Sequence, residues 1–334
     1  MEYLLNTQLR SIKPDFKGNP FDGNKFIHPD YPFNPDFRKV LKWQFSKNPQ
    51  RKEKKEDTWK LNIIPNEDFL HAKEDMIVWL GHATFFIRLN GVSMLTDPIF
   101  YSIPPLVPRL SALPLAPEKI KGLDYILLSH GHFDHLDKKS LQLLYKSNKA
   151  EMLTSLKLGA IVQKWIPNLQ VQEAGWYQQY KTEKKGIEIF YLPARHWFRR
   201  SMNDTNQTLW GSFVIRSAQK TIYFGADSGA GNHFEEISQL FPHIDVCMIG
   251  VGAYKPSYIM EESHTSPHEA VQLFNGMVAV SDKKNKTLIP MHYGSYDLAD
   301  EPLGEPYRVL QNLEKEKQIR GSLKLLDVGE EFKL

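Results

Sequence analysis

The segment Leu128–Asp137, with the sequence LSHGHFDHLD, constrains this chain more than any other feature. It follows the apolar run YILLS and precedes a helix-like stretch, so its histidines and aspartates lie where a strand gives way to a loop. Side chains two residues apart in an extended segment point the same way, so His130 and His132 can meet at one ion. Asp134 and His135 follow once the chain has begun to turn, and they can reach a second point nearby. Imidazole and carboxylate bind zinc, iron or manganese, and the HxHxDH spacing predicts metal binding.

Further ligands are needed, because four donors cannot complete two metal sites. His196 follows the β-rich run IEIFYLPAR, Asp227 follows KTIYFGA and His292 follows TLIPM. Each stands where such a run ends in a polar or glycine-containing loop, which is where strands present functional groups. Taken singly, each residue can be an ordinary polar loop residue. Together with the first motif they predict a dinuclear centre.

The change in composition and periodicity along the chain predicts an N-terminal extension and one main domain. Residues 1–70 are rich in Pro, Asn, Asp, Lys and aromatic residues and show little periodicity, so we expect them to wrap the main domain. Residues 71–334 form the main domain. With 41% hydrophobic and 24% charged residues, the composition is that of a globular protein able to bury a core.

Short β-rich runs and separate helical stretches alternate loosely from Met76 onward. Asn90-Gly91 lies between two of the runs and predicts a hairpin. Asp137 and Ser266 are placed to cap helices. The pattern favours sheets covered by helices rather than strict βαβ alternation. The predicted strands lie within 76–80, 84–89, 92–96, 125–129, 187–193, 208–217, 220–226, 245–252 and 287–291, and the predicted helices are 138–147, 155–164, 233–241, 266–281 and 304–319.

Charge is distributed unevenly, although the net charge is only +3. Between Arg38 and Lys60 there are nine Lys or Arg against three Asp or Glu, with aromatic residues nearby. One interpretation is a solvated surface helix and loop, and the other is a patch that meets anionic lipid headgroups. The small net charge and the absence of a nucleic-acid-binding motif argue against a nucleic acid partner.

The location expected from the sequence is cytoplasmic, with peripheral membrane contact left open. The N-terminus has no basic segment followed by an apolar core, and no apolar run approaches the roughly 18 residues of a spanning helix. The single cysteine, Cys247, excludes an internal disulfide framework and is expected to be a buried thiol. Oligomeric state is left open by the sequence.

The residues resemble the metallo-β-lactamase superfamily, whose ligand order is HxHxDH, then a distant His, an Asp and a final His. Within it, the chain resembles the branch of phospholipases D that hydrolyse N-acylphosphatidylethanolamine. The resemblance runs from about Met76 to Leu298. The segments that carry it are WLGHAT (79–84), LTDP (95–98), HW followed by Arg200, Asp204, Asn206 and LWGS (196–212), PHEAV (267–271) and MHYG (291–294).

The resemblance implies an α/β fold, the four-layered αββα sandwich, with two zinc ions at one edge. It implies one zinc on His130, His132 and His196, and the other on Asp134, His135 and His292. Asp227 would bridge the two ions. His264 would reach the substrate, and His82 and Asp97 would orient ligands from behind.

Two departures from the branch concern the neighbourhood of the substrate. Ala226 precedes Asp227, where the branch often has glycine, and the Pro- and Leu-rich segment Tyr101–Lys119 does not match the corresponding basic loop. The remaining histidines have no motif around them and are interpreted as surface or packing residues: His28, His71, His233, His243 and His268.

The reaction implied is hydrolysis by hydroxide held between two cations, with Asp134 and His264 as catalytic residues. His264 is also placed at the start of a predicted helix, where a surface role is the alternative. The leading hypothesis is a phosphodiesterase acting on N-acylphosphatidylethanolamine or a related lipid or small molecule. A lactone or carboxylic ester hydrolase with the same centre is a second hypothesis. A non-hydrolytic dinuclear iron protein that handles oxygen or electrons belongs to a different class. Zinc is the expected metal, with iron or manganese as the alternatives.

Overall fold

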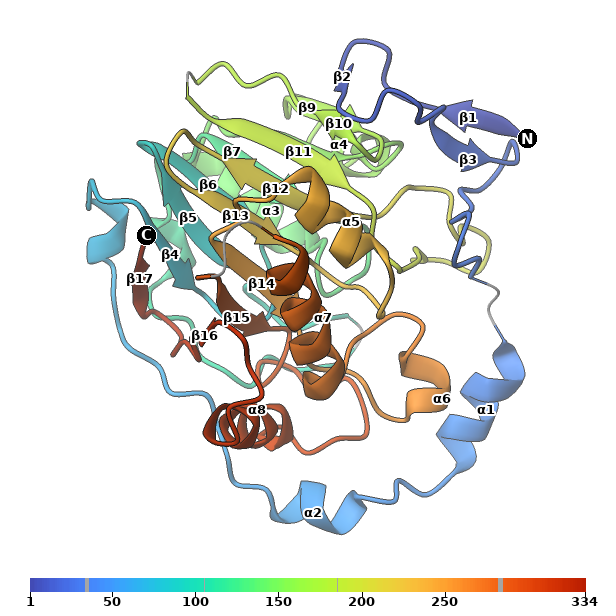
Figure 1. Cartoon of the computed structure of the whole chain (residues 1–334), viewed down its shortest axis with the longest axis vertical. Helices are drawn as coiled ribbons and strands as arrows, with labels where there is room; N and C mark the ends of the chain where they lie inside the picture. Colours follow the sequence, from blue (N-terminus) through green and yellow to red (C-terminus); the bar gives the residue numbers. More distant parts are fainter. Residues whose placement is uncertain (34–35, 105, 185, 282–284) are drawn as a thin grey trace.

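The fold is built from two β-sheets that face each other, with helices on their outer sides (Figure 1). The computed structural model describes residues 1–33, 36–104, 106–184, 186–281 and 285–334. A buried ring contact joins the two sheets, since Phe85 and Phe224 lie with their centroids 6.4 Å apart. This is the αββα layering that was predicted.

The first sheet has seven strands. Its β6, β7, β8 and β9 are parallel, whereas β17, β4, β5 and β6 pair antiparallel. Its central strands are buried along their whole length, as expected of strands covered on both faces. The order is β17 (Glu331–Lys333), β4 (Met76–Trp79), β5 (Phe85–Leu89), β6 (Val92–Thr96), β7 (Tyr125–Leu128), β8 (Glu151–Ser155) and β9 (Val171–Ala174).

The second sheet has eight strands and repeats this mixed pattern. Strands β13 to β16 are parallel, and β2 and β10 to β13 pair antiparallel. The order is β16 (Ser322–Leu323), β15 (Thr287–Met291), β14 (Val246–Gly250), β13 (Thr221–Phe224), β12 (Ser212–Arg216), β11 (Glu188–Leu192), β10 (Gln178–Gln179) and β2 (Arg10–Ser11).

The helices cover the outer faces of the sheets. Helix α7 (Pro267–Val280) contacts β14 and carries α5 (His233–Leu240) and α8 (Glu305–Lys315) beside it. Figure 1 shows α5 and α7 in front of the eight-stranded sheet. Helix α3 (Lys138–Ser147) follows β7, and α4 (Gly159–Gln163) contacts β9. One-turn 3₁₀ segments stand at Asp68–Leu70 and Pro117–Lys119.

Local sequence signals account for several boundaries. Asp137 accepts hydrogen bonds from the backbone N–H groups of Lys139 and Ser140, and so caps α3 as predicted. Ser266 and Glu269 form a capping box at the start of α7. The predicted hairpin is confirmed, with Asn90 at φ 51° and Gly91 at φ 74° between β5 and β6.

The predicted helix 155–164 is wrong at its start. Ser155 ends the buried strand β8, and the helix begins only at Gly159, whose N–H donates to Glu173 Oε1 at 2.7 Å. A short run of mixed apolar and polar residues fits either a helix or a strand, and pairing with the neighbouring strands decides between the two. Strands β8, β9 and β17 were not predicted, and the strand predicted at 208–217 is limited to β12.

The described residues of the segment 1–70 run around the main domain, and several of their apolar side chains, such as Phe21, Phe26 and Phe69, are buried against its core. Strands β1 (Glu2–Leu4) and β3 (Asn19–Phe21) pair with each other, and β2 adds an edge strand to the eight-stranded sheet. Helices α1 (Phe37–Phe45) and α2 (Arg51–Glu56) then follow the molecule's rim, as Figure 1 shows in blue. The boundary near residue 70 stays a prediction.

Cys247 is fully buried, and burial raises the pKa of its thiol to about 12. It is therefore a packing residue. Within the described residues, none of the helices has the length and apolar character needed to span a bilayer.

Candidate metal centre

The predicted ligands meet at one edge of the sandwich, because each stands just beyond the end of a strand. His130, His132, Asp134 and His135 follow β7, and His196 lies beyond β11. Asp227 follows β13 and His292 follows β15. The carboxyl ends of the parallel strands β7, β13 and β15 thus bring together residues separated by up to 162 positions, from His130 to His292.

Three histidines form the first group of donors. The Nδ1 atom of His132 lies 3.0 Å from His130 Nε2 and 3.0 Å from His196 Nε2. The rings of His130 and His196 are buried, and those of His132 and His196 stand nearly perpendicular, at 84°. Three ring nitrogens at this separation have the spacing needed to hold one metal ion.

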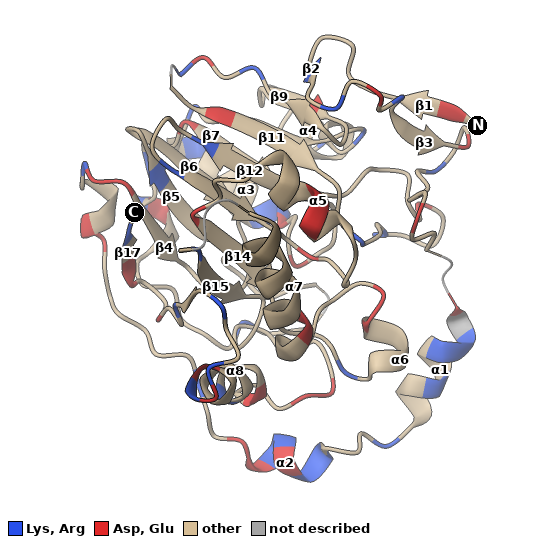
Figure 2. Cartoon of the chain, viewed as in Figure 1, with Lys and Arg blue, Asp and Glu red and all other residues tan. Residues whose placement is uncertain are grey.

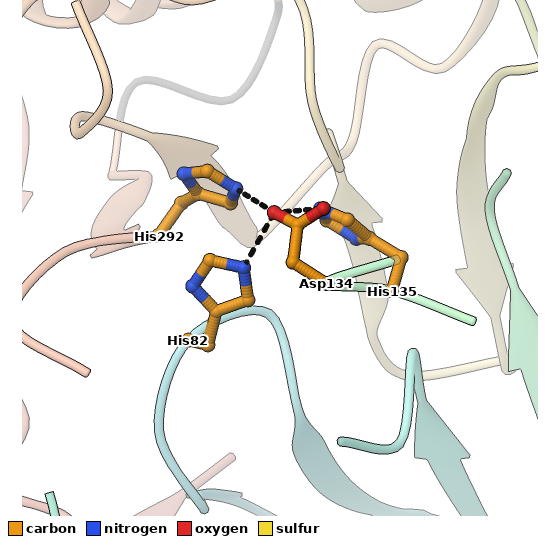
Figure 3. A group of neighbouring side chains, drawn as sticks. All are labelled: His82, Asp134, His135 and His292. Carbon is orange, nitrogen blue, oxygen red and sulfur yellow. Dashed lines mark hydrogen bonds and ion pairs between the residues drawn. The ribbon is translucent and has the colours of Figure 1, made fainter. Parts of the chain in front are cut away.

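Asp134, His135 and His292 form the second group, together with His82 (Figure 3). The Oδ2 atom of Asp134 lies 3.0 Å from His82 Nε2, 3.3 Å from His292 Nε2 and 3.5 Å from His135 Nε2. Imidazole and carboxylate at these distances suit a divalent transition metal ion.

Asp227 lies between the two groups. Its Oδ2 is 3.1 Å from His135 Nε2 and 3.2 Å from His292 Nε2, and it is 3.9 Å from His196 Nε2 in the other group. Its other oxygen, Oδ1, is buried without a hydrogen-bond partner among the described residues. A buried carboxylate oxygen left unsatisfied is costly, so the donor set fits bound cations better than an empty polar cluster.

The protonation of the histidines differs between the groups. Burial, with neighbouring histidines, lowers the pKa of His130 and His196 well below the usual value and that of His132 to about 4. Neutral imidazole is the form that binds metal. Burial also acts to lower the pKa of His292, but the carboxylates of Asp227 and Asp134 outweigh it and raise the pKa to about 9. Cations in that group would replace these protons.

Side chains behind the ligands fix their orientation. Asp97 Oδ2 lies 2.8 Å from His135 Nδ1 and accepts a hydrogen bond from the Ser129 hydroxyl at 2.6 Å. His196 Nδ1 lies 3.0 Å from the carbonyl oxygen of Ser263. His82 has a left-handed backbone, with φ 55°, and its N–H donates to Ser295 Oγ. Asp97 and His82 thus lie beside predicted ligands, and their role in orienting those ligands stays a prediction.

His264 lies at the opening of the centre. Its Nδ1 is 3.8 Å from Asp227 Oδ2, and its side chain is 16% exposed. Burial lowers its pKa to about 4, so its imidazole is neutral at pH 7. It therefore belongs to the cluster and is not a surface residue of the following helix.

A groove begins beside His264 and runs between the N-terminal segment and the main domain. Phe33 stacks on Trp197 with centroids 4.4 Å apart, and Trp197 in turn lies 4.8 Å from the ring of His132. The apolar wall therefore reaches a predicted metal ligand. Other residues of the groove come from α1 and from α6 (Ser257–Met260): Lys39, Val40, Ile259 and Met260.

Arg200 has a structural role that the sequence did not reveal. Its Nη1 donates to the carbonyl oxygens of Gly131 and Leu136, at 2.8 and 3.1 Å, and its guanidinium stacks over Phe133. It therefore clamps the metal-binding loop from both ends. The HW…D.N motif contains Arg200, but only the fold shows which loop it holds.

The chain belongs to the β-lactamase superfamily. The model of the "Beta-lactamase superfamily domain" matches residues 93–293, which include every predicted ligand. Both the predicted superfamily and its fold class are thereby confirmed.

Two curated relatives illustrate the range of similar proteins. An uncharacterized protein of Mycobacterium tuberculosis is 30% identical over 238 residues, covering 69% of this chain and 61% of the relative, so the chain spans less than two thirds of that protein's length. The N-acyl-phosphatidylethanolamine-hydrolyzing phospholipase D 1 of Caenorhabditis elegans is 28% identical over 314 residues, covering 89% of this chain and 83% of the relative.

Solved structures agree on the fold. An isothiocyanate hydrolase from Delia radicum gut bacteria superposes with a TM-score of 0.62 at 16% identity, covering 78% of this chain and 98% of that one. At this identity the similarity concerns the fold alone.

Proposed function

We propose that this protein is a metal-dependent hydrolase with a dinuclear zinc centre. The first ion would be held by His130, His132 and His196, and the second by Asp134, His135 and His292. Asp227 would bridge them. The observation that carries the proposal is the position of Asp227, whose Oδ2 lies within 3.9 Å of donors from both groups. With Asp227 shared, each ion would have four protein ligands, and because zinc can expand to five ligands in catalytic sites, water or substrate could still be added.

A bound pair of divalent ions supplies hydroxide near neutral pH and stabilises negative charge on the reacting centre. The protein's own residues hold and orient the participants. The carboxylate of Asp134 accepts a hydrogen bond from the molecule that lies between the two groups of donors. His264, neutral and facing Asp227, donates a hydrogen bond to the substrate from the groove side. Trp197 excludes water from the side of His132.

The substrate class we propose is a phosphodiester in an N-acylated phospholipid, such as N-acylphosphatidylethanolamine. The similarity to the Caenorhabditis elegans phospholipase D supports this assignment. The groove supports it independently, because Phe33, Val40 and Trp197 present apolar surface directly beside His264. An acyl chain is the part of such a lipid that apolar surface recognises.

A substrate panel tests the assignment. Purified protein is assayed on N-acylphosphatidylethanolamine, bis(p-nitrophenyl) phosphate, a lactone and RNA, each with and without chelator. We expect hydrolysis of N-acylphosphatidylethanolamine and bis(p-nitrophenyl) phosphate, but not of RNA, that is lost with chelator and restored by zinc. Hydrolysis of the lactone alone would replace the phosphodiesterase assignment with the carboxylic ester one.

A further inference from the structure

Helix α1 has one side that belongs to the groove. Lys39 and Val40 line the groove, and Lys39 Nζ pairs with Glu262 at 3.6 Å. Trp43 Nε1 donates to Asp300 Oδ1 at 3.0 Å. These contacts fix which face of the helix points inward.

The outward face of α1 combines apolar and basic side chains. Arg38, Leu41, Lys42 and Phe45 follow the spacing i, i+3, i+4, i+7 and so share one side of the helix. Lys42 stands at the edge of this side, with its exposed ammonium 4.9 Å from the centre of the Tyr258 ring. Phe45 is 85% exposed and Leu41 is 52% exposed. Exposed aromatic and aliphatic side chains on a surface helix, flanked by long basic ones, are typical of helices that lie in a membrane interface.

Basic residues continue beyond α1 into α2, as Figure 2 shows along the lower rim of the molecule. Glu53 and Glu56 are the acidic residues of α2, and they leave the segment positively charged. Over the part of the chain that the structure describes, no ion pair engages the exposed basic residues of this segment, which are Arg38, Lys42, Lys47, Arg51, Lys52 and Lys55. This surface is complementary to anionic headgroups.

A further exposed apolar side chain, Met202, follows a groove residue closely in the sequence. Met202 is 85% exposed and follows Arg199, which lines the groove beside Trp197, by three residues. Exposed apolar side chains thus occur close in sequence to groove residues of α1 and of the segment 197–202.

We propose that α1 and the segment leading to α2 dock on an anionic lipid surface. Leu41 and Phe45 insert among the headgroups while Arg38 and Lys42 contact phosphates. Because the opposite side of the same helix walls the groove, docking brings the groove to the bilayer, and an acylated lipid can enter it without crossing water. The functional role of this docking, delivery of substrate, rests on the proposed lipid substrate. Binding to the lipid surface does not itself require hydrolysis.

Co-sedimentation of the full chain with vesicles tests the proposal. The vesicles are phosphatidylcholine alone or mixed with phosphatidylserine, and they contain no N-acylated lipid, so the result is independent of hydrolysis. We expect binding to the mixed vesicles that weakens with salt. Replacing both Leu41 and Phe45 with serine should reduce the partition coefficient by about tenfold or more. Arg38→Gln and Lys42→Gln should each reduce it by about fivefold.

Tyr145→Ser is the matched control, because Tyr145 is 38% exposed on α3, outside the proposed surface. It should bind vesicles as the unaltered chain does, and circular dichroism checks that each variant is folded. Equal binding by the Leu41/Phe45 variant, or no preference for anionic vesicles, would overturn the proposal. Binding of RNA by the chain in a parallel assay, without binding to vesicles, would also overturn the proposal. If the unaltered chain fails to bind vesicles but hydrolyses dispersed lipid, the docking is rejected while the proposed function stands.

Discussion

Asp134 is the residue on which the second group of donors depends most. Its Oδ2 contacts three histidines, of which His82 lies 3.0 Å away. Asn keeps the shape of the side chain but removes its charge. We expect Asp134→Asn to lower kcat on bis(p-nitrophenyl) phosphate by at least about 100-fold while the chain remains folded. Initial rates and circular dichroism measure the two effects, and unchanged turnover would contradict the proposed mechanism.

His264 makes a second prediction at the scale of one side chain. Because it faces the groove and lies 3.8 Å from Asp227, we expect His264→Gln to lower kcat/KM by about 100-fold or more with metal content unchanged. His268, exposed and one turn further along, is the control, and His268→Gln should leave both quantities unaltered. A loss of metal in His264→Gln would instead make His264 a ligand.

At the scale of single elements, the metal-binding loop after β7 depends on a residue far away in sequence. Arg200 donates to Gly131 and Leu136 and stacks on Phe133. Lysine keeps the charge but lacks the planar guanidinium that stacks on Phe133 and holds Nη1 rigidly between the two carbonyl oxygens. We expect Arg200→Lys to lower the free energy of unfolding by about 2 kcal/mol and metal affinity by about 10-fold or more. Denaturant titration and competition with a chromophoric chelator measure the two, and an unaltered metal affinity would show that Arg200 is not needed to hold the loop.

The elements also show how far the sequence could be interpreted. Strand runs such as TFFIRL and KTIYFGA, the Asn90-Gly91 turn and the caps Asp137 and Ser266 are local signals, and they placed most of the core correctly. Strands β8 and β9 were missed because their polar and mixed residues acquire their identity only from parallel pairing. No local sequence signal connects Ser263 or Arg200 with the predicted ligands. Ser263 contributes its backbone carbonyl and Arg200 binds backbone carbonyls, and these contacts form only in the folded chain.

The same distinction holds at the site. A motif of six residues identified the first four ligand candidates, and strand ends together with family resemblance suggested the rest. The alanine before Asp227 adopts φ 50°, a left-handed conformation that glycine takes without strain, which accounts for the glycine often found there in the related branch. Fold geometry was needed to show that Asp227 stands between the groups.

For the whole molecule, buried histidines outside the centre make stability depend on pH. Burial, with nearby Arg195, lowers the pKa of His28 from 6.5 to about 4, and burial lowers that of His233 to about 3. Below pH 6.5 these two histidines therefore bind protons in the unfolded chain but stay neutral in the folded chain. The contribution of these neutral histidines to the free energy of unfolding is fully present above pH 6.5 and is lost as the pH falls toward 4.

We expect the free energy of unfolding to fall by about 1.4 kcal/mol for each of these two histidines between pH 7.5 and 5.5. Urea titrations at the two pH values measure the change. Replacing His28 and His233 together with asparagine should remove this part of the pH dependence. An identical dependence in the double variant would show that neither histidine is held neutral by the fold.

The whole fold serves to bring seven side chains from distant strand ends to one place, and the central claim is that they hold two metal ions. Anomalous X-ray diffraction from crystals grown without chelator tests this directly. We predict two metal peaks, each about 2.0–2.3 Å from its ligand atoms, one among His130, His132 and His196 and one among Asp134, His135 and His292, with Asp227 reaching both. The absorption edge identifies zinc, iron or manganese. The seven side chains gathered around no metal, or around a single ion, would contradict the dinuclear centre.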